Sequence, residues 1–256
     1  MKKTFILLSI ISCIFAEVKL GGVTYFDFSA NDETSGFNFQ RQYFGYGGDV
    51  SDKVSYKILF DVGRTGQLDG EDSRLVAFLK KAQINYKSSW GKFNFGLIGM
   101  NTYNIQEKNW GYRFIEKSTI DKNKFSGTAD IGVGYSKKFF ENLNFSLLLV
   151  NGEGYKKPQE DKYYKVALNT TYGEGNLLKK DGYNVGIVYT TEQTASDPNT
   201  MTSIFGGFAG RGLRVGGEYD MQTKDGSESN IISMSANYSI NEKSWYKKSI
   251  NFIRRD

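Results

Sequence analysis

The sequence predicts an all-β protein, an antiparallel transmembrane β-barrel of which about 13 strands are visible in the chain. Three observations predict it. Segments of about eight to fourteen residues alternate apolar and polar side chains. The connections between them are alternately short and long, and the chain begins with a secretory signal.

The alternation is clear in residues 142–151, where Leu147 and Leu149 fall on one face of an extended chain while Asn144 and Ser146 fall on the other. The same period recurs in the stretches 54–62, 129–135 and 232–240. One face of such a strand suits lipid or a core, and the other face suits water.

The signal reads as residues 1–16, which leaves residues 17–256 as the barrel domain. Lys2 and Lys3 form a positive start, and an apolar run over residues 5–15 ends at Ala16. A lipoprotein processing site at residues 10–13, ending in Cys13, is the alternative. No later segment has the roughly 20 apolar residues of a spanning helix, so strands must provide any membrane residence.

Composition agrees with an exported barrel. Cys13 is the only cysteine, so the mature chain has no disulfide. A mean hydropathy of -0.47 is compatible with a membrane barrel, because only alternate residues face lipid. The 17 Tyr and 19 Phe suit interfacial girdles. A soluble β-sandwich, which also uses these residues, is the alternative.

The strands can be placed in order from the alternation and from the turn residues that separate them. Only 2 Pro stand against 29 Gly, which keeps ladder-breaking residues out of the strands and allows a curved sheet. No helix is predicted. The expected strands are 18–30, 37–47, 54–63, 75–87, 92–100, 128–139, 143–151, 162–172, 183–191, 202–209, 213–222, 230–240 and 248–254.

With the N-terminus on the periplasmic side, each connection has a predicted side of the membrane. The inner turns at 88–91, 140–142 and 210–212 are tight, and the outer connections are longer on the whole. The inner connections 173–182 and 241–247 depart from that rule. Trp90 and Trp245 both fall on the inner side. Their side chains either anchor the barrel at the membrane interface or simply pack against neighbouring residues.

The longest connection is the third outer loop, residues 101–127, which is far longer than a loop without its own structure usually is. It mixes aromatic residues with charges of both signs. Aromatic side chains such as Trp110 and Tyr112 can attach it to a barrel wall while its charges face water.

Together, the signal, the alternating strands, the asymmetric connections and the enlarged third loop resemble the Gram-negative outer-membrane porins. The stretch 99–135, with NIQEKNWGYRFIEK, looks most like the phosphate-selective porin and porin-superfamily group. The resemblance implies residence in the cell outer membrane, a possible homotrimer, and a third loop that narrows the lumen. The pore-constriction residues are then Glu107, Lys108, Arg113, Glu116 and Lys117. An extracellular lid or adhesive tip is the alternative for this loop, and no residue identifies phosphate as the solute.

The C-terminus departs from the porin pattern. Porins usually have an even number of strands and end in an aromatic residue, whereas this chain has an odd count and ends Arg254-Arg255-Asp256. We therefore expect that the chain is truncated at its C-terminal side and that the parent barrel has roughly 14 to 16 strands.

The polar face of each strand gives the candidate lumen lining, in which basic residues are somewhat more numerous than acidic ones. The candidates are Arg41, Lys57, Lys81, Lys138, Lys165, Arg214, Glu218 and Asp220, with Lys19, Lys87, Asp27, Asp61 and Asp130 on the same faces. Fixed charges in a narrow pore select counter-ions, which predicts weak anion preference. The interleaved charges exclude a clustered nucleic-acid interface.

The chain contains no histidine, which removes the commonest routes to hydrolysis in an outer-membrane barrel. We therefore expect no enzyme activity and no cofactor. We also expect no metal site, since the acidic run 69–72 is typical of the tip of a hairpin. The predicted function is a water-filled channel for passive diffusion of small anions or polar solutes, with outer-membrane lipid as the surrounding partner. The alternative is a structural or adhesive barrel that presents its loops without transport.

Overall fold

The structure, a computed structural model, describes residues 18–64 and 74–239, together with the backbone of residues 248–255. It contains one sheet of thirteen antiparallel strands, which confirms the predicted fold class. The strands are β1 (Lys19–Ala30), β2 (Ser35–Asp49), β3 (Val54–Arg64), β4 (Leu75–Ser88), β5 (Gly91–Gly99), β6 (Ala129–Phe139), β7 (Leu143–Val150), β8 (Lys165–Gly173), β9 (Gly182–Glu192), β10 (Asn199–Gly210), β11 (Leu213–Lys224), β12 (Ser227–Tyr238) and β13 (Lys248–Arg255). The predicted signal, the acidic run 69–72 and Trp245 lie outside the described residues.

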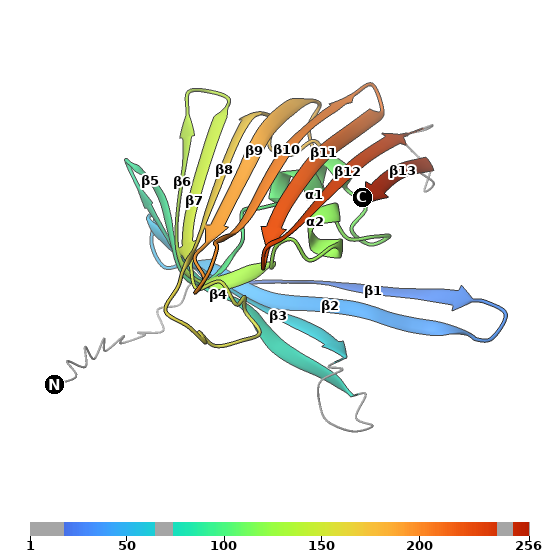
Figure 1. Cartoon of the computed structure of the whole chain (residues 1–256), viewed down its shortest axis with the longest axis horizontal. Helices are drawn as coiled ribbons and strands as arrows, with labels where there is room; N and C mark the ends of the chain where they lie inside the picture. The colour runs from blue at the N-terminus through green and yellow to red at the C-terminus, as the bar shows by residue number, and fades with distance from the viewer. Residues whose placement is uncertain (1–17, 65–73, 240–247, 256) are drawn as a thin grey trace.

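Each strand pairs with its neighbours in the sequence, in the order β1 to β13. Within the described residues β1 and β13 are not paired with each other, so the sheet is open. It curves into a trough, and Figure 1 shows the arc of strands β5 to β12 around a hollow side. We call the two surfaces of this sheet the concave face and the convex face.

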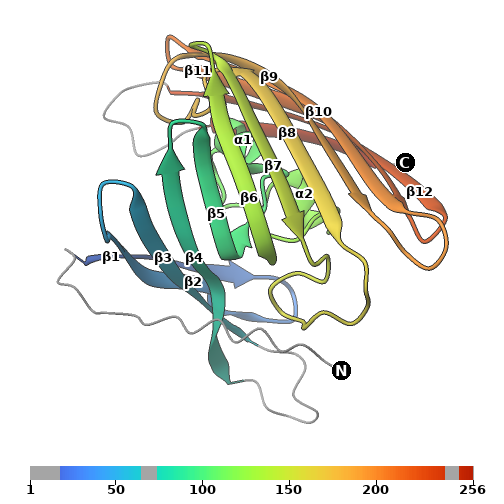
Figure 2. The same cartoon turned by 90° about the vertical axis from the view of Figure 1, so that its left-hand side faces the viewer.

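Large apolar side chains cover the convex face. Leu147 and Leu149 of β7 are 39% and 45% exposed, and Ile187 of β9 is 46% exposed, although all three belong to strands that are paired on both sides. Figure 2 looks onto this face, with the helices behind the strands. A soluble protein rarely exposes so extended an apolar surface, whereas a barrel wall in lipid requires one.

Two irregularities interrupt the alternation. In the β3–β4 pair, Leu59 opposes Lys81 but Phe60 opposes Leu79, so Lys80 is an extra residue in a β-bulge. A bulge places two consecutive side chains on nearly the same side of the strand. Lys80 and Lys81 therefore both belong to the concave face. A similar shift occurs between β1 and β2 at Tyr25.

The connection between β5 and β6 contains two helices, α1 (Asn104–Trp110) and α2 (Thr119–Lys122), so the prediction that there are no helices is wrong. Helices of 7 and 4 residues are too short to be stable alone, and the contacts they make with the sheet stabilise them. This explains why sequence periodicity missed them. Within the described part of the chain, no helix has the length and apolar character to cross a bilayer.

The core lies between this connection and the concave face. One cluster joins Tyr103, Ile120 and Phe125 of the loop to buried wall residues, namely Val188, Met201, Phe205 and Ile231. A second cluster contains Ile98, Met100, Leu148, Val150 and Ala167. Residues 101–127 are thus held in the trough by apolar burial, and we call them the third loop.

Candidate functional site

The third loop starts where β5 ends and runs deep into the trough (Figure 1). Helix α1 contacts β10 and β11. Arg214, the second residue of β11, donates from Nε to the Asn109 carbonyl oxygen at 2.9 Å and from Nη2 to the Trp110 carbonyl oxygen at 3.1 Å. Arg214 therefore satisfies carbonyl groups at the C-terminal end of α1 that the helix itself leaves unpaired. Its guanidinium also lies 5.3 Å from the centre of the Tyr112 ring.

Buried amides attach the loop to the wall at three further points. Asn109 exchanges two hydrogen bonds with Asn184 of β9, and Gln106 donates to Ser203 Oγ of β10 at 3.3 Å. Near the start of the loop, Asn169 of β8 donates to the Asn101 carbonyl oxygen at 2.7 Å. Directional bonds of this kind fix the position of the loop more exactly than apolar contact does.

The opposite side of the loop presents a charged triad. Arg113 Nε lies 3.7 Å from Glu107 Oε2, and Arg113 Nη2 lies 3.6 Å from Asp121 Oδ2. Glu107 also interacts electrostatically with Lys80 and Lys81 of β4. The triad thus faces the part of the wall built from the first strands.

That part of the wall has its own ion network, centred on Asp61 of β3. The Asp61 carboxylate has no exposed surface and accepts two hydrogen bonds from Arg41 Nη1, at 3.0 and 2.9 Å. It also accepts from Lys80 Nζ at 3.4 Å and from Tyr155 Oη at 3.2 Å. Tyr155 comes from the β7–β8 connection, so that connection is attached to the first strands.

Burial and charge act in opposite directions on Glu107. Burial raises the pKa of the Glu107 carboxyl above its ordinary value, while Arg113, Lys80 and Lys81 act to lower it. Burial prevails, so the loop holds a carboxylate that ionises less readily than a free one. Burial likewise lowers the pKa of Lys108, which faces Glu174 in the β8–β9 connection.

The five predicted constriction residues do not form one group. Glu107 and Arg113 belong to the triad that faces β4. Glu116 binds Lys122 Nζ at 2.7 Å and accepts from the Lys117 backbone at 2.9 Å, on the side of β11 and β12. Lys108 points toward the β8–β9 connection. The structure therefore separates these residues into three places.

The predicted lining residues also differ in their surroundings. Arg214, Glu218 and Asp220 lie on the concave face of β11 beneath the third loop, so the loop covers them instead of leaving them open to the water of a lumen. Arg41, Lys57 and Lys81 lie on the first strands beside the open part of the trough, and Lys138 lies on the concave face of β6. Lys165 Nζ binds Glu192 Oε2 at 2.5 Å.

Sequence reasoning did not select three residues of this site. Strict alternation places Lys80 on the lipid face, and no sequence signal marked the bulge that turns it inward. Asp121 was visible as a loop carboxylate, but its pairing with Arg113 depends on the fold of the loop. Tyr155 lies in the β7–β8 connection, 94 residues from Asp61 in the sequence, and no local pattern relates the two.

A second hollow opens on the concave face at the tight-turn end of β4 to β8. Its volume is about 680 Å³. Among the described residues that line it, the charged ones are all lysines, namely Lys87, Lys92, Lys137 and Lys138. Lys87 and Lys92 are direct cross-strand partners. Two like charges in this position repel each other unless anions or water screen them.

No protein-family model matches this chain. No curated protein sequence matches it either. Solved structures do match. The OmpF structure from Salmonella typhi, a complex with daunomycin, has a TM-score of 0.67 at 9% identity, covering 94% of this chain and 79% of that chain.

The structure of OmpT of Vibrio cholerae, expressed in the outer membrane, has a TM-score of 0.60 at 13% identity, covering 97% of this chain and 79% of that chain. Both neighbours are outer-membrane proteins of Gram-negative bacteria. At such low identity the likeness concerns the fold alone. The chain has the fold of a porin-like outer-membrane barrel.

Proposed function

We propose that this protein resides in the outer membrane and forms a non-enzymatic, water-filled channel for passive diffusion of small solutes and ions, with a weak preference for anions. One observation carries the proposal: the third loop lies inside the trough, with its triad of Glu107, Arg113 and Asp121 directed toward the basic wall at Lys80 and Lys81. A loop in this position narrows a passage and lines it with fixed charge.

The distribution of charge supports the anion preference. In the triad and the Asp61 network, carboxylates compensate much of the positive charge. In the hollow at the tight-turn end, Lys87, Lys92 and Lys138 face the lumen, and no carboxylate is among the described lining residues. An ion that enters from this end meets positive charge first. Such a field favours anions and weakens as ionic strength rises.

Two finer features are part of the same proposal. The stretch 99–135 resembles phosphate-selective porins, which makes inorganic phosphate the first anion to test, although no described residue singles it out. A homotrimer is proposed from the resemblance to porins, and the exposed apolar convex face is compatible with either lipid or a neighbouring barrel.

A planar bilayer tests the channel. Purified full-length protein is expected to give stepwise conductance, with a reversal potential displaced toward the anion side in a salt gradient. The variant Arg113→Glu reverses the charge at the centre of the triad and should reduce the anion preference. Lys224→Glu, at the exposed end of β11, makes the same charge change away from the constriction and should change it less.

A membrane that stays sealed at all voltages would contradict transport and favour the alternative, a barrel that only displays loops. If Arg113→Glu and Lys224→Glu shift the reversal potential equally, the triad does not line the narrow passage. If the wild type is cation-selective, the channel stands and the anion preference is wrong.

A further inference from the structure

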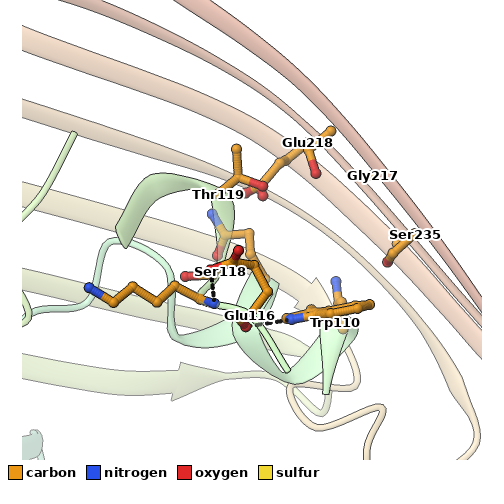
Figure 3. Close-up of a pocket in the computed structure, with 12 residues that line it drawn as sticks. Trp110, Glu116, Ser118, Thr119, Gly217, Glu218 and Ser235 are labelled. Carbon is orange, nitrogen blue, oxygen red and sulfur yellow. Dashed lines mark hydrogen bonds between the residues drawn. The ribbon is translucent and has the colours of Figure 1, made fainter. Parts of the chain in front are cut away.

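Two hollows of very different size lie between the third loop and the wall. The cavity between the loop and strands β11 and β12 has a volume of about 40 Å³ and lies beside Trp110 and Glu218 (Figure 3). A bound water needs roughly 10–15 Å³ of such space, so this cavity can hold water but no larger solute. The hollow at the tight-turn end of β4 to β8 has about 680 Å³, within the range of roughly 300–1,000 Å³ that is typical of small-molecule sites. Lys87, Lys92 and Lys138 line it, and we call it the lysine hollow.

Strand pairing places the polar side chains of the lysine hollow in two rows across the concave face. The first row runs from β4 to β8 through directly paired residues, in the order Lys87, Lys92, Ser136, Ser146 and Asn169. The second row, nearer the β6–β7 turn, runs from β6 to β8 in the order Lys138, Asn144 and Thr171. Lysines therefore occupy the half of the hollow on β4 to β6, and neutral hydroxyl and amide groups occupy the half on β6 to β8.

The cationic half lacks compensating charge. Lys87 and Lys92 are direct partners, and Lys138 is a diagonal neighbour of Lys92, a relationship that separates residues by about 7–8 Å. None of the three lysines forms an ion pair with a described residue, and no described residue that lines the hollow is acidic. The ammonium groups of lysines in this arrangement can converge on one anionic group, which removes their mutual repulsion.

The neutral half combines fixed and free hydrogen-bonding groups. Asn101, the first residue of the third loop, donates from Nδ2 to Ser146 Oγ at 3.0 Å, and Asn169 Nδ2 donates to the Asn101 carbonyl oxygen at 2.7 Å. These bonds hold the Ser146 hydroxyl in place and leave its own proton free to donate. Ser136 and Asn144 have no side-chain hydrogen bond within the described part of the chain. A ligand with several hydroxyl groups can pair with all three side chains.

We propose that the lysine hollow binds a monosaccharide that carries one anionic group, either a phosphate or a carboxylate. The anionic group lies at the lysines, and the sugar hydroxyls pair with Ser136, Asn144 and Ser146. Inorganic phosphate alone leaves the neutral half to water, and a neutral sugar leaves the lysines uncompensated, so neither uses the whole site. A site built to hydrogen-bond hydroxyl groups discriminates against ligands that lack them. Only the inference that such a sugar is a transported solute rests on the proposed function.

Isothermal calorimetry of the full-length protein in detergent tests binding without transport. The probes are glucose 6-phosphate and glucuronate, each compared with its anion alone, inorganic phosphate or acetate, and with neutral glucose. All are measured at equal ionic strength, because salt screens the lysines. Each sugar anion should bind about tenfold tighter than its anion alone, which is the gain expected of two added hydrogen bonds. Binding of only one of the two sugar anions assigns the anionic group as phosphate or as carboxylate.

Two variants separate the halves of the site. Asn144→Ala should weaken binding of the sugar anion about two- to tenfold and leave binding of its anion alone unchanged, because it removes a neutral hydrogen-bonding group. Lys92→Gln should weaken both by about tenfold or more, because it removes a charged one. Lys224→Gln, at the exposed end of β11, removes the same charge outside the hollow and is the matched control.

The proposal is overturned if neither sugar anion binds, if both bind no tighter than the anion alone, or if glucose binds equally well. Equal effects of Lys92→Gln and Lys224→Gln, or wild-type affinity of Asn144→Ala for the sugar anion, would also overturn it. In a planar bilayer, the sugar anion that binds should reduce the wild-type current more than that of Asn144→Ala. A protein that binds the sugar but does not conduct would refute the channel and leave the site intact, whereas a conducting protein without binding would refute the site alone.

Discussion

Asn109 of helix α1 and Asn184 of strand β9 exchange two side-chain hydrogen bonds, each 2.9 Å long, and both side chains are buried. Each amide donates to the oxygen of the other. Asn184 also donates to the Glu174 carbonyl oxygen at 2.8 Å, which connects the loop, the wall and the β8–β9 connection. A pair of this kind specifies where the third loop lies along the trough.

Replacing one partner should therefore loosen the loop. Asn184→Leu leaves the Asn109 amide and the Glu174 carbonyl without partners, at a cost of about 1–3 kcal/mol per buried group. We expect a lower free energy of unfolding and larger current fluctuations. The double variant Asn109→Leu, Asn184→Leu removes both amides and should recover part of the loss. Denaturant unfolding measures the cycle, and additive losses would contradict the coupling.

Asp61→Asn should destabilise the protein and change its selectivity. The substitution removes the charge that compensates Arg41 and Lys80, and breaking a buried ion pair from one side costs about 3–5 kcal/mol. The uncompensated cations should shift the reversal potential further toward anions. Asp27→Asn, at an exposed carboxylate on β1, is the control for unfolding. Equal unfolding midpoints of the two variants would argue against the buried network.

The two loop glutamates should respond to pH with opposite signs. Burial raises the pKa of Glu107 in the folded protein, so ionising it there is unfavourable relative to the unfolded chain. Glu107→Gln should therefore be more stable than the wild type at neutral pH. That advantage should disappear as pH falls through the raised pKa to the ordinary value near 4.5.

For Glu116, burial acts to raise the pKa of the carboxyl, but the hydrogen bonds from Lys122 and from the Lys117 backbone prevail and lower that pKa. Its stabilising contribution is present above the ordinary pKa and is lost as pH falls through the lowered one. Glu116→Gln should thus be less stable than the wild type at neutral pH. Thermal unfolding as a function of pH measures the stability of both variants relative to the wild type. If Glu107→Gln and Glu116→Gln change the stability in the same direction, the opposite pKa shifts of the two glutamates are wrong.

A charge on the convex face should be costly in lipid. Ile187→Lys places an ammonium group at the middle of β9, where such a change costs about 2–4 kcal/mol at the bilayer midplane. Gln40→Lys introduces the same charge on the concave side of β2, beside the Asp27 carboxylate, and should fold almost normally. Folding yield in lipid vesicles is the measurement. Equal yields would mean that the convex face does not meet hydrocarbon.

The sequence contained enough to predict the strands, because a two-residue period is local information. Leu147 and Leu149 could be assigned to the same face without knowledge of any partner strand. The site depends on long-range contacts instead. The Asn109–Asn184 pair and the contact of Tyr155 with Asp61 join residues far apart in the chain, and no local pattern encodes them. Helix α1 could not be predicted for the same reason, since its contacts with the distant wall strands stabilise it.

The bulge at Lys80 determines which changes of length β4 can accept. Leu75, Ala77 and Leu79 are exposed on one side of it, and Ile84 and Tyr86 on the other, so the parity of outward residues switches at the extra position. Deleting Lys80 alone would bring Leu79 next to Lys81 and make the pairing with β3 regular, with Leu75, Ala77 and Leu79 still turned outward. In a lineage of such chains, the loss of one residue can therefore persist at the bulge itself, whereas a loss elsewhere in this half of β4 would turn the outward residues before it to the concave face.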